Sequence, residues 1–422
     1  MAITIGWIVI LTLVGLAMMQ AIFVWLHCRF LNSNDTDEFD ESYIPNVAVL
    51  LCARGSDPSL PNCLTGLVKQ TYEPFEIHVV VDDLHDPALI LVNDFFAKEQ
   101  RHRPTVHVLK EHAKSRSLKC SAIILGLEEL DNSIEVVALI DADTVADPNW
   151  LRDLVQPLAD PAIGATTGNR WFSPTKRNLA SVVRQAWNAA AVVQMTIYQI
   201  PWGGSLALKR STIERCELLS CWSTAFCEDT MLTKILKHND LRMFRVPDLV
   251  LVNNESTTMG STFRWIVRQL LTVRLYHRDW PLVLTHGLIS SVCMVAAPIV
   301  ILAMYVNAEP IIASLVFAVL FLFEINNVCL LIAIQTANQR VVCQRNPSTS
   351  QFNSSRAGIL PILVTQLLHP FAVIAATLTR RVSWRGIDYS IGPKKKITML
   401  DYYPFCQADD SDQTRSGSRS IG

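Results

Sequence analysis

Long uninterrupted apolar runs lie at the two ends of the chain, and short apolar runs occupy its middle. Residues 3–26 carry no charge, and further apolar stretches lie at about 282–306 and 311–335. Each is long enough to cross the roughly 30 Å hydrocarbon core of a bilayer as a helix. The N-terminal run has no basic start and no small-residue cleavage site, which favours an uncleaved anchor over a signal peptide. The pattern therefore predicts an integral membrane protein with an anchor over residues 1–30.

A fourth apolar stretch, 357–378, is interrupted by Pro361 and Pro370. Arginines precede the second span and follow the third, whereas the link 307–310 has no Lys or Arg. The positive-inside rule then places the central region and the 336–356 loop in the cytoplasm. A full fourth crossing would move the basic residues after it to the outer side. We therefore expect two membrane spans in region 281–378, with 357–378 either re-entrant or interfacial, or else crossing as a third.

The middle of the chain has a different periodicity. Short Val- and Ile-rich runs predict strands at 46–52, 76–81, 105–109 and 135–140. Amphipathic stretches between them predict helices at 59–70, 87–99, 117–130 and 149–158. This alternation predicts an α/β domain over residues 45–280, with a mostly parallel sheet covered on both faces. Ligands of such sheets bind beyond the carboxyl ends of the strands.

Charged residues follow the predicted strands. Arg54 comes after the first strand, Asp82 and Asp83 after the second, and Asp141 and Asp143 after the fourth. Alternation along a strand puts Asp141 and Asp143 on one side, so both can reach one cation. Carboxylate oxygens suit Mg²⁺ or Mn²⁺, which substrate phosphates would also bind. A lone D-x-D is also typical of a solvated turn, but its place after an apolar strand favours the metal site.

Two further positions are candidates for contacts with a ligand. Lys119 lies at a predicted helix start, where it would contact a diphosphate or, alternatively, be a solvated helix lysine. Trp202, Gly203 and Gly204 allow a ligand to approach the backbone closely beside an aromatic ring. An ordinary hairpin turn is the alternative for this segment.

An acidic pair, Glu228 and Asp229, opens the predicted helical run 230–237. The helix dipole alone favours carboxylates at this position, so capping is one interpretation. The other is that one of them is a general base.

Composition narrows the class of protein. The chain has 422 residues, of which 50% are hydrophobic and 18% charged, and a net charge of −1. The low charge fraction agrees with a membrane protein, and the absence of basic excess argues against nucleic-acid binding. The 11 cysteines form no C-x-x-C pair, which favours a reducing compartment. Residues 379–422 read as a basic segment followed by a disordered tail.

These motifs in this order resemble the family 2 glycosyltransferases, which have the nucleotide-sugar-binding GT-A fold. The resemblance rests on LLCARGSDPSLPNCLTGLVKQTYEPFEIHVVVDD, ALIDADTVADPNWL, WGGSLALKR and CEDTML. The flanking membrane helices and SWRGIDYSI at 383–391 are similar to the ceramide glucosyltransferase-like branch.

The resemblance implies a role for most of these residues. Asp82 and Asp83 would contact the uracil or ribose of a UDP-sugar, and Asp141 and Asp143 would serve the diphosphate and its Mg²⁺ or Mn²⁺. Asp229 would deprotonate the acceptor hydroxyl in a direct displacement that inverts the anomeric carbon. Arg54 and Lys119 would belong to the nucleotide-sugar site.

One motif of that family departs from its usual form. The family usually ends its catalytic domain with Q-x-x-R-W, whereas here Gln269 is followed by Thr and Val where Arg-Trp would fall. Arg268 or Arg274 would then supply positive charge to the diphosphate, and Trp265 or Trp280 the ring. The departure argues against a processive synthase.

The sequence thus predicts a multi-pass membrane glycosyltransferase of glycolipid biosynthesis that moves one sugar from a UDP-sugar to a lipid acceptor. If the source is bacterial, the membrane is the inner or plasma membrane, with the catalytic domain in the cytoplasm. The apolar stretch 178–200 suits an interfacial helix that guides the acceptor, although a buried core helix fits equally. The alternatives are a processive polysaccharide synthase of the cellulose, hyaluronan or chitin synthase type and a non-catalytic scaffold with a glycosyltransferase-like fold.

Overall fold

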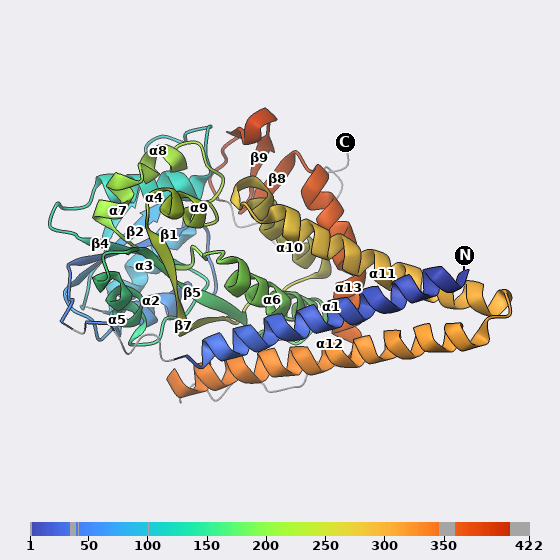
Figure 1. Cartoon of the computed structure of the whole chain (residues 1–422). Helices are drawn as coiled ribbons and strands as arrows, with labels where there is room; N and C mark the ends of the chain where they lie inside the picture. The colour runs from blue at the N-terminus through green and yellow to red at the C-terminus, as the bar shows by residue number, and fades with distance from the viewer. Residues whose placement is uncertain (1, 34–38, 41, 100, 346–358, 406–422) are drawn as a thin grey trace.

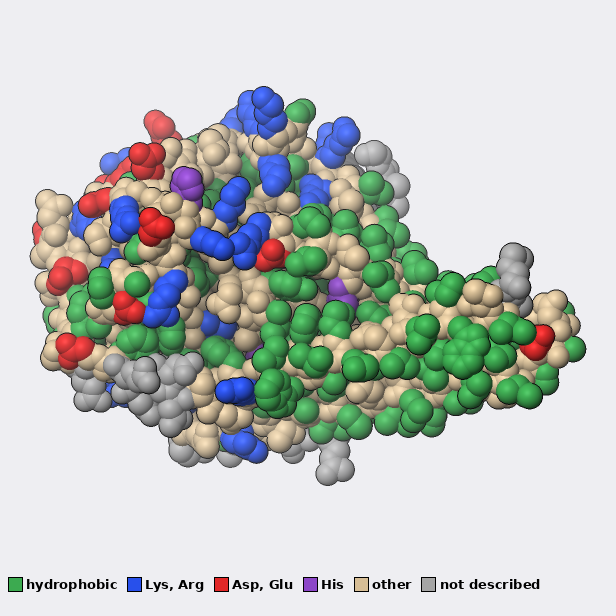
Figure 2. All heavy atoms as spheres, in the orientation of Figure 1, with side chains coloured by type: hydrophobic (Ala, Val, Ile, Leu, Met, Phe, Trp, Pro, Cys, Tyr) green, Lys and Arg blue, Asp and Glu red, His purple; other side chains and the backbone are tan. Residues whose placement is uncertain are grey.

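The structure, a computed structural model, describes residues 2–33, 39–40, 42–99, 101–345 and 359–405. A domain built on a β-sheet lies at one end, and long helices project from it (Figure 1). Figure 2 shows hydrophobic side chains over the projecting helices and charged side chains gathered over the sheet domain. This division is the one that the apolar runs of the sequence predict.

The sheet has seven strands in the order β3-β2-β1-β4-β6-β5-β7. Their bounds are β1 Val47–Ala53, β2 Phe75–Val81, β3 Thr105–Val108, β4 Val136–Asp141, β5 Ile163–Phe172, β6 Ser205–Lys209 and β7 Arg242–Asn253. All neighbours are parallel except β6, which runs antiparallel to both β4 and β5. The mostly parallel α/β fold and the first four strands are confirmed, while sequence analysis did not predict β5, β6 and β7.

Helices cover both faces of this sheet because successive strand residues point to opposite sides. Val49 and Leu51 of β1 pack with the helices of one face, and Ala48 and Leu50 pack with those of the other. The first face carries α2 Leu60–Val68, α3 Pro87–Phe96, α5 Trp150–Val155 and the short η1 Gln156–Ala159. The second carries α4 Leu118–Glu128, α7 Arg210–Arg215, α8 Leu218–Trp222 and α9 Leu232–His238. The four predicted helices of this region are therefore present.

Four helices of the described residues are long and apolar enough to cross a membrane. They are α1 Ala2–Leu31, α11 Trp280–Val306, α12 Pro310–Arg345 and α13 Ile359–Leu378. The three clear spans of the sequence correspond to α1, α11 and α12. The predicted loop from residue 336 is wrong as far as Arg345, because Asn338, Val341 and Val342 continue the buried side of α12. The rest of that loop lies outside the described residues.

The fourth apolar stretch is a single helix, α13, with Pro370 inside it. In Figure 1 it runs across α11 and α12 instead of alongside them. It packs on the sheet domain: Thr365 Oγ1 lies 3.4 Å from the Val183 carbonyl, and Trp187 Nε1 donates to His369 Nδ1 over 3.3 Å. Its length and composition suit a crossing, and its packing suits an interfacial position, so the interfacial placement stays a prediction.

Two amphipathic helices join the sheet domain to the membrane helices. The first, α6 Leu179–Tyr198, confirms the helix predicted at 178–200 and begins at Asn178, whose side chain accepts a hydrogen bond from Ser181 N. The second, α10 Met259–Tyr276, is capped in the same way by Thr258. Such caps satisfy backbone N–H groups that a helix start leaves unpaired.

The segment after α13 folds back onto the sheet domain. It forms a small antiparallel sheet of β8 Arg381–Trp384, β9 Ile387–Ile391 and β10 Ile397–Met399, with the short η2 Pro393–Lys395 between the last two. Tyr389 of this sheet is 1% exposed and packs edge-on against Phe226. The predicted basic segment after residue 379 is thus folded, and the structure describes the chain as far as residue 405. The tail predicted to be disordered falls almost entirely in 406–422, which lie outside the described residues.

Candidate active site

A cleft of about 490 Å³ opens at the carboxyl ends of β1, β2 and β4. Most of the residues proposed from the sequence line it, including Arg54, Asp82, Asp141 and Asp143. This is the edge at which parallel sheets bind ligands.

A lysine joins two acidic groups in this cleft. Lys119 Nζ lies 2.7 Å from Asp141 Oδ1 and 2.7 Å from Glu228 Oε1. Burial works to raise the pKa of Asp141, but the charges of Lys119, Arg170 and Arg385 together outweigh it and the pKa falls. Burial raises the pKa of Glu228 to about 7 even though Lys119 opposes the shift. Lys119 is therefore paired with two carboxylates while it lines the cleft, and its contact with a diphosphate stays a prediction.

Asp143 is the carboxylate of this site that lacks a partner. Its Oδ1 is buried and has no hydrogen-bond partner among the described residues. Burial and the nearby charge of Asp141 raise the pKa of Asp143 to about 6, while Arg170 and Arg385 oppose that shift. A divalent cation would satisfy the buried oxygen and offset the paired negative charge.

The remaining ligands of such a cation would have to come from outside the protein. Within the described ranges, no group of three or more His, Cys, Asp or Glu side chains could hold a metal ion. Two carboxylates with substrate phosphates and water are a common arrangement for Mg²⁺ and similar ions. Asp141 and Asp143 fit this arrangement.

Asp229 has a fixed position on the wall of the cleft. Its Oδ2 accepts a 2.9 Å hydrogen bond from Gly203 N, and its Oδ1 accepts bonds of 2.6 and 2.8 Å from the backbone and hydroxyl of Thr230. Glu228 points instead toward Lys119 and is 1% exposed. Both residues line the cleft, but Glu228 is paired with Lys119, so Asp229 is the better candidate for the base, and that role stays a prediction.

The two glycines beside Trp202 are needed for packing within the protein. A Cβ at Gly203 would overlap the Glu228 carboxylate, and one at Gly204 would overlap the Trp202 ring and lie 2.5 Å from Asp141 Oδ2. Trp202 and Gly204 line the cleft, whereas Gly203 contributes its backbone N–H to Asp229. The close approach predicted for a ligand is therefore made by side chains of the chain itself.

The first two strand ends differ in what they bring to the cleft. Arg54 forms an ion pair with Asp82, which is 4% exposed. Asp83 does not line the cleft, because its Oδ1 accepts hydrogen bonds from the backbone of His85 over 2.7 Å and contacts the His85 ring. The structure thus places Asp82, and not Asp83, where a nucleoside could be contacted.

The two arginines proposed in α10 also differ in position, because Arg268 lines the cleft and Arg274 does not. Arg268 and Gln269 line the cleft, and the Arg268 guanidinium lies 4.8 Å from the Trp384 ring. Arg274 does not line it: its amino groups donate to the carbonyls of Ala376 and Thr379 at the end of α13. Arg274 therefore caps a helix, for which a cation near free carbonyls is favourable.

Sequence analysis offered Trp265 as a possible ring of the site but did not propose Arg264 or Arg170, which also line the cleft. Arg264 precedes Trp265 in α10, so an Arg-Trp pair does occur, about two turns before the position at which it was sought. Both residues line the cleft, whereas Trp280 does not. Arg170 in β5 lies 5.4 Å from the Trp202 ring and 5.1 Å from the Trp265 ring. The Arg264-Trp265 pair in α10 could have been recognised in the sequence as an Arg-Trp motif, but nothing in the sequence indicates that Arg170 lines the site.

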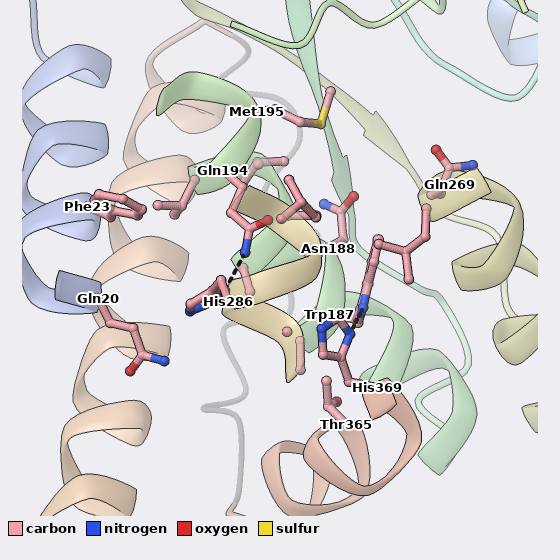
Figure 3. A pocket seen from close by; sticks show the side chains of 18 of the residues that line it. Gln20, Phe23, Trp187, Asn188, Gln194, Met195, Gln269, His286, Thr365 and His369 are labelled. Atoms are coloured by element: carbon pink, nitrogen blue, oxygen red, sulfur yellow. Dashed lines mark hydrogen bonds between the residues drawn. The ribbon is translucent and has the colours of Figure 1, made fainter. Parts of the chain in front are cut away.

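A second cavity, of about 300 Å³, lies between α6 and the membrane helices. Figure 3 shows its side chains, which include Trp187 and Gln194 of α6, His286 of α11 and His369 of α13. Gln194 Nε2 lies 3.2 Å from His286 Nδ1. Most of the other lining residues are apolar, among them Phe23, Ala191, Val283, Phe323 and Leu331.

The two cavities meet at the candidate base. Five residues line both of them: Arg170, Trp202, Asp229, Gln269 and Thr272. A cleft lined by acidic and basic side chains at the sheet edge thus adjoins an apolar pocket among the membrane helices, and these five residues form their shared wall. A polar reactant and an apolar one could meet beside Asp229.

Comparisons with known proteins identify the fold. The chain is similar to the mannosyltransferase PcManGT from Pyrobaculum calidifontis, solved in complex with GDP-Man and Mn²⁺, with 17% identity, a TM-score of 0.51, and coverage of 90% of this chain and 99% of that one. This likeness shows the glycosyltransferase fold. GalNAc-T7, solved with UDP, GalNAc and Mn²⁺, aligns at 11% identity over 56% of this chain and 50% of that chain, with a TM-score of 0.39. S. aureus TarS aligns at 13% identity over 82% of this chain and 96% of that one, with a TM-score of 0.38. Scores below 0.5 add nothing to the argument.

The family model for glycosyl transferase family 21 matches residues 6–397, which include both the sheet domain and the membrane helices. The expected assignment to family 2 is not confirmed, because the matching model is that of family 21. The resemblance to the ceramide glucosyltransferase-like branch stays a prediction. The wider expectation of a membrane-associated glycosyltransferase agrees with the match and with the four apolar helices. The chain belongs to glycosyltransferase family 21.

Proposed function

We propose that this glycosyltransferase transfers a sugar from a nucleotide-sugar donor to a hydroxyl group of a lipid acceptor. The observation that carries the proposal is the meeting of the polar cleft and the apolar pocket at Asp229. A donor in the cleft and a lipid in the pocket would bring their reacting atoms together at that carboxylate.

The charges of the cleft support a diphosphate as the donor's leaving group. Arg170 and Arg268 line it, and within the described residues neither forms an ion pair with a carboxylate. Burial lowers the pKa of Arg268 to about 10, as expected for a cation without a close counter-charge. Arginine binds phosphate through paired N–H groups. A UDP-sugar is the first candidate donor, and the GDP-Man in PcManGT makes GDP-sugars the second.

A divalent cation, Mg²⁺ or Mn²⁺, would be held by Asp143 and by the free oxygen of Asp141. When bound, such an ion offsets negative charge on the departing nucleoside diphosphate. The Mn²⁺ in PcManGT supports this part of the proposal. Lys119 would keep Asp141 in place by its 2.7 Å contact.

The second cavity supports a lipid as acceptor. Its walls come from α1, α6, α11, α12 and α13, so an acyl chain could enter it from the bilayer. Apolar surface favours such a chain by about 0.8 kcal/mol for each buried CH₂. Because Asp229 lines both the pocket and the cleft, the acceptor's hydroxyl would be the group that reaches the cleft.

The chemistry then requires one displacement. The acceptor oxygen attacks the anomeric carbon while the bond from that carbon to the phosphate oxygen breaks. Asp229 takes the hydroxyl proton, and the nucleoside diphosphate leaves with the bonding electron pair. A single displacement inverts the anomeric configuration. Hydrogen bonds from Gly203 and Thr230 hold the base in position.

We place the catalytic domain on the cytoplasmic side of the membrane. Arginines lie in the segment before α11 and at the end of α12, on the side of the sheet domain, whereas the link between α11 and α12 has no arginine. By the positive-inside rule the arginine-rich side is the cytoplasmic one. Arg345, at the end of α12, forms ion pairs with Asp147, Asp153 and Asp248 of that domain. The cytoplasm is also where nucleotide-sugars would reach the cleft.

Membranes that contain the full chain test this function. They are incubated with radiolabelled UDP- and GDP-sugars and Mn²⁺, and the products are extracted into organic solvent. We expect label in one discrete lipid product with one donor, formed about 10²–10⁴-fold more slowly by the Asp229→Asn variant. Label in an insoluble, polydisperse product would instead support a processive synthase, and no label with any donor would support a non-catalytic scaffold.

A further inference from the structure

The hairpin of β8 and β9 has an unusual residue at its tip. Trp384 pairs with Ile387, so only Arg385 and Gly386 form the turn. Both have positive φ, 50° and 79° respectively. Two such residues form the type I′ turn, for which Asn, Asp and Gly are the usual choices. An arginine held in the left-handed region points to a role for its side chain.

The tip of this hairpin reaches the cleft. Trp384, Arg385 and Tyr389 line it together with Asp141 and Asp143. The Arg385 side chain is 45% exposed, and its Nη2 donates to Asp57 Oδ2 over 2.8 Å. A guanidinium has five N–H donors. Among the described residues this is its one hydrogen bond, which leaves donors available to a ligand.

The hairpin is fastened to the strand ends that form the site. Arg54 donates from Nε to the Arg385 carbonyl over 2.9 Å and from Nη2 to the Tyr403 carbonyl over 2.7 Å. The same arginine forms the ion pair with Asp82. The Tyr389 hydroxyl accepts a 3.1 Å hydrogen bond from Leu118 N at the start of α4. These contacts fix the hairpin beside the end of β1, far from it in sequence.

We propose that the C-terminal hairpin is a wall of the donor site and that Arg385 binds the diphosphate of a nucleoside diphosphate. Asp57 is a positioning residue that orients the guanidinium. The inference rests on the proposed function, because it takes the donor to be a nucleotide-sugar. It extends that function to a segment that lies about 100 residues beyond the sheet domain in the chain.

Equilibrium binding to the purified full chain tests the assignment without using activity. The dissociation constants of UDP and GDP are measured by titration calorimetry in detergent with Mn²⁺. The variants are Arg385→Gln, Arg385→Lys and Asp57→Asn. Arg381→Gln is the matched control, because Arg381 is an exposed residue of β8 that does not line the cleft. The melting temperature without nucleotide is measured for each variant.

We expect Arg385→Gln to weaken binding of the nucleotide that the wild type binds by roughly tenfold to a hundredfold, as for loss of a charged hydrogen bond. Arg385→Lys should recover part of the affinity, Asp57→Asn should lose less, and Arg381→Gln should bind as the wild type does. Unliganded melting temperatures should be equal. Wild-type affinity in Arg385→Gln would overturn this inference and leave the proposed function standing. A loss of affinity matched by a lower melting temperature would do the same. Absence of binding by the wild type would overturn the proposed donor as well.

Discussion

The carboxylate of Asp229 accepts a 2.9 Å hydrogen bond from the backbone N–H of Gly203. This bond ties the candidate base, which follows α8, to the segment that enters β6. A side chain at Gly203 would overlap Glu228, so the same glycine keeps both acidic residues in place. The position of the Asp229 carboxylate is therefore set by a backbone N–H of the sheet domain. Its surroundings are the polar cleft on one side and the apolar pocket on the other.

Replacing Asp229 by Asn should remove the base and keep the shape of the site. We expect the rate of sugar transfer to fall by about 10²–10⁴-fold, which is the usual contribution of a general base. Nucleoside diphosphate binding and the melting temperature should stay near the wild-type values. Glu214→Gln is the control, because the Glu214 side chain is 71% exposed and pairs with Arg210. Neither of these two residues lines the cleft. A variant that retained wild-type transfer rates would show that another group takes the proton.

The bridge made by Lys119 should contribute to stability. Lys119→Met would leave the buried Glu228 and the adjacent Asp141 without their cation, at a cost of about 3 kcal/mol in unfolding free energy. The measurement is the melting temperature in detergent. The double variant Lys119→Met/Glu228→Gln should recover part of the loss, because the amide carries no charge. Equal melting temperatures for wild type and Lys119→Met would contradict this role.

Stability should also depend on pH through Glu228. Burial, the largest cause, raises the pKa of Glu228 to about 7, so between about 4.5 and 7 the folded state binds a proton that the unfolded state has lost. The contribution of this group is therefore favourable below about 4.5 and is lost as the pH rises through about 7. In Glu228→Gln that part of the slope should be absent. Melting curves at several pH values check this, and parallel curves for both proteins would contradict it.

Much of the sheet domain could be predicted because its residues interact with near neighbours. The alternation in β1 to β4 and the apolar faces of α2 to α5 are local patterns, and the charged residues at the strand ends follow directly. Arg274 and Arg385 could not be placed in this way. The partners of Arg274 are carbonyls about 100 positions away, and Arg385 reaches the cleft only through the return of the chain after α13. Asp82 lines the cleft and Asp83 does not, because the turn after β2 brings the Asp83 carboxylate to the backbone N–H of His85.

The apolar pocket should be sensitive to added volume. Ala191→Trp would fill space between α6 and α11 and should lower lipid-dependent transfer at least about tenfold, since overpacking excludes a chain from a formed cavity. Nucleoside diphosphate binding should not change. Val295→Trp is the control, because Val295 of α11 is 59% exposed and does not line the pocket. Equal transfer by both variants would place the acceptor elsewhere.

The end of α12 should be needed for its attachment to the sheet domain. Arg345 is 10% exposed and contacts Asp147, Asp153 and Asp248 at 3.1, 2.6 and 2.7 Å. Arg345→Gln would leave three carboxylates without their shared cation, which should cost about 3 kcal/mol and lower the melting temperature. Arg340→Gln, on an exposed position of the same helix, should have little effect. If both variants melt at the same temperature, the contacts of Arg345 do not stabilise the protein.

The meeting of donor and acceptor at Asp229 is tested most directly by an experimental structure of the full chain in a lipid nanodisc with UDP or GDP and Mn²⁺. We predict nucleoside diphosphate density beside Asp141, Asp143 and Arg385, and lipid density between α6 and α11 whose polar end reaches Asp229. Nucleotide bound away from the cleft, or a pocket closed to lipid with the acceptor approaching from the other side of Asp229, would contradict the account.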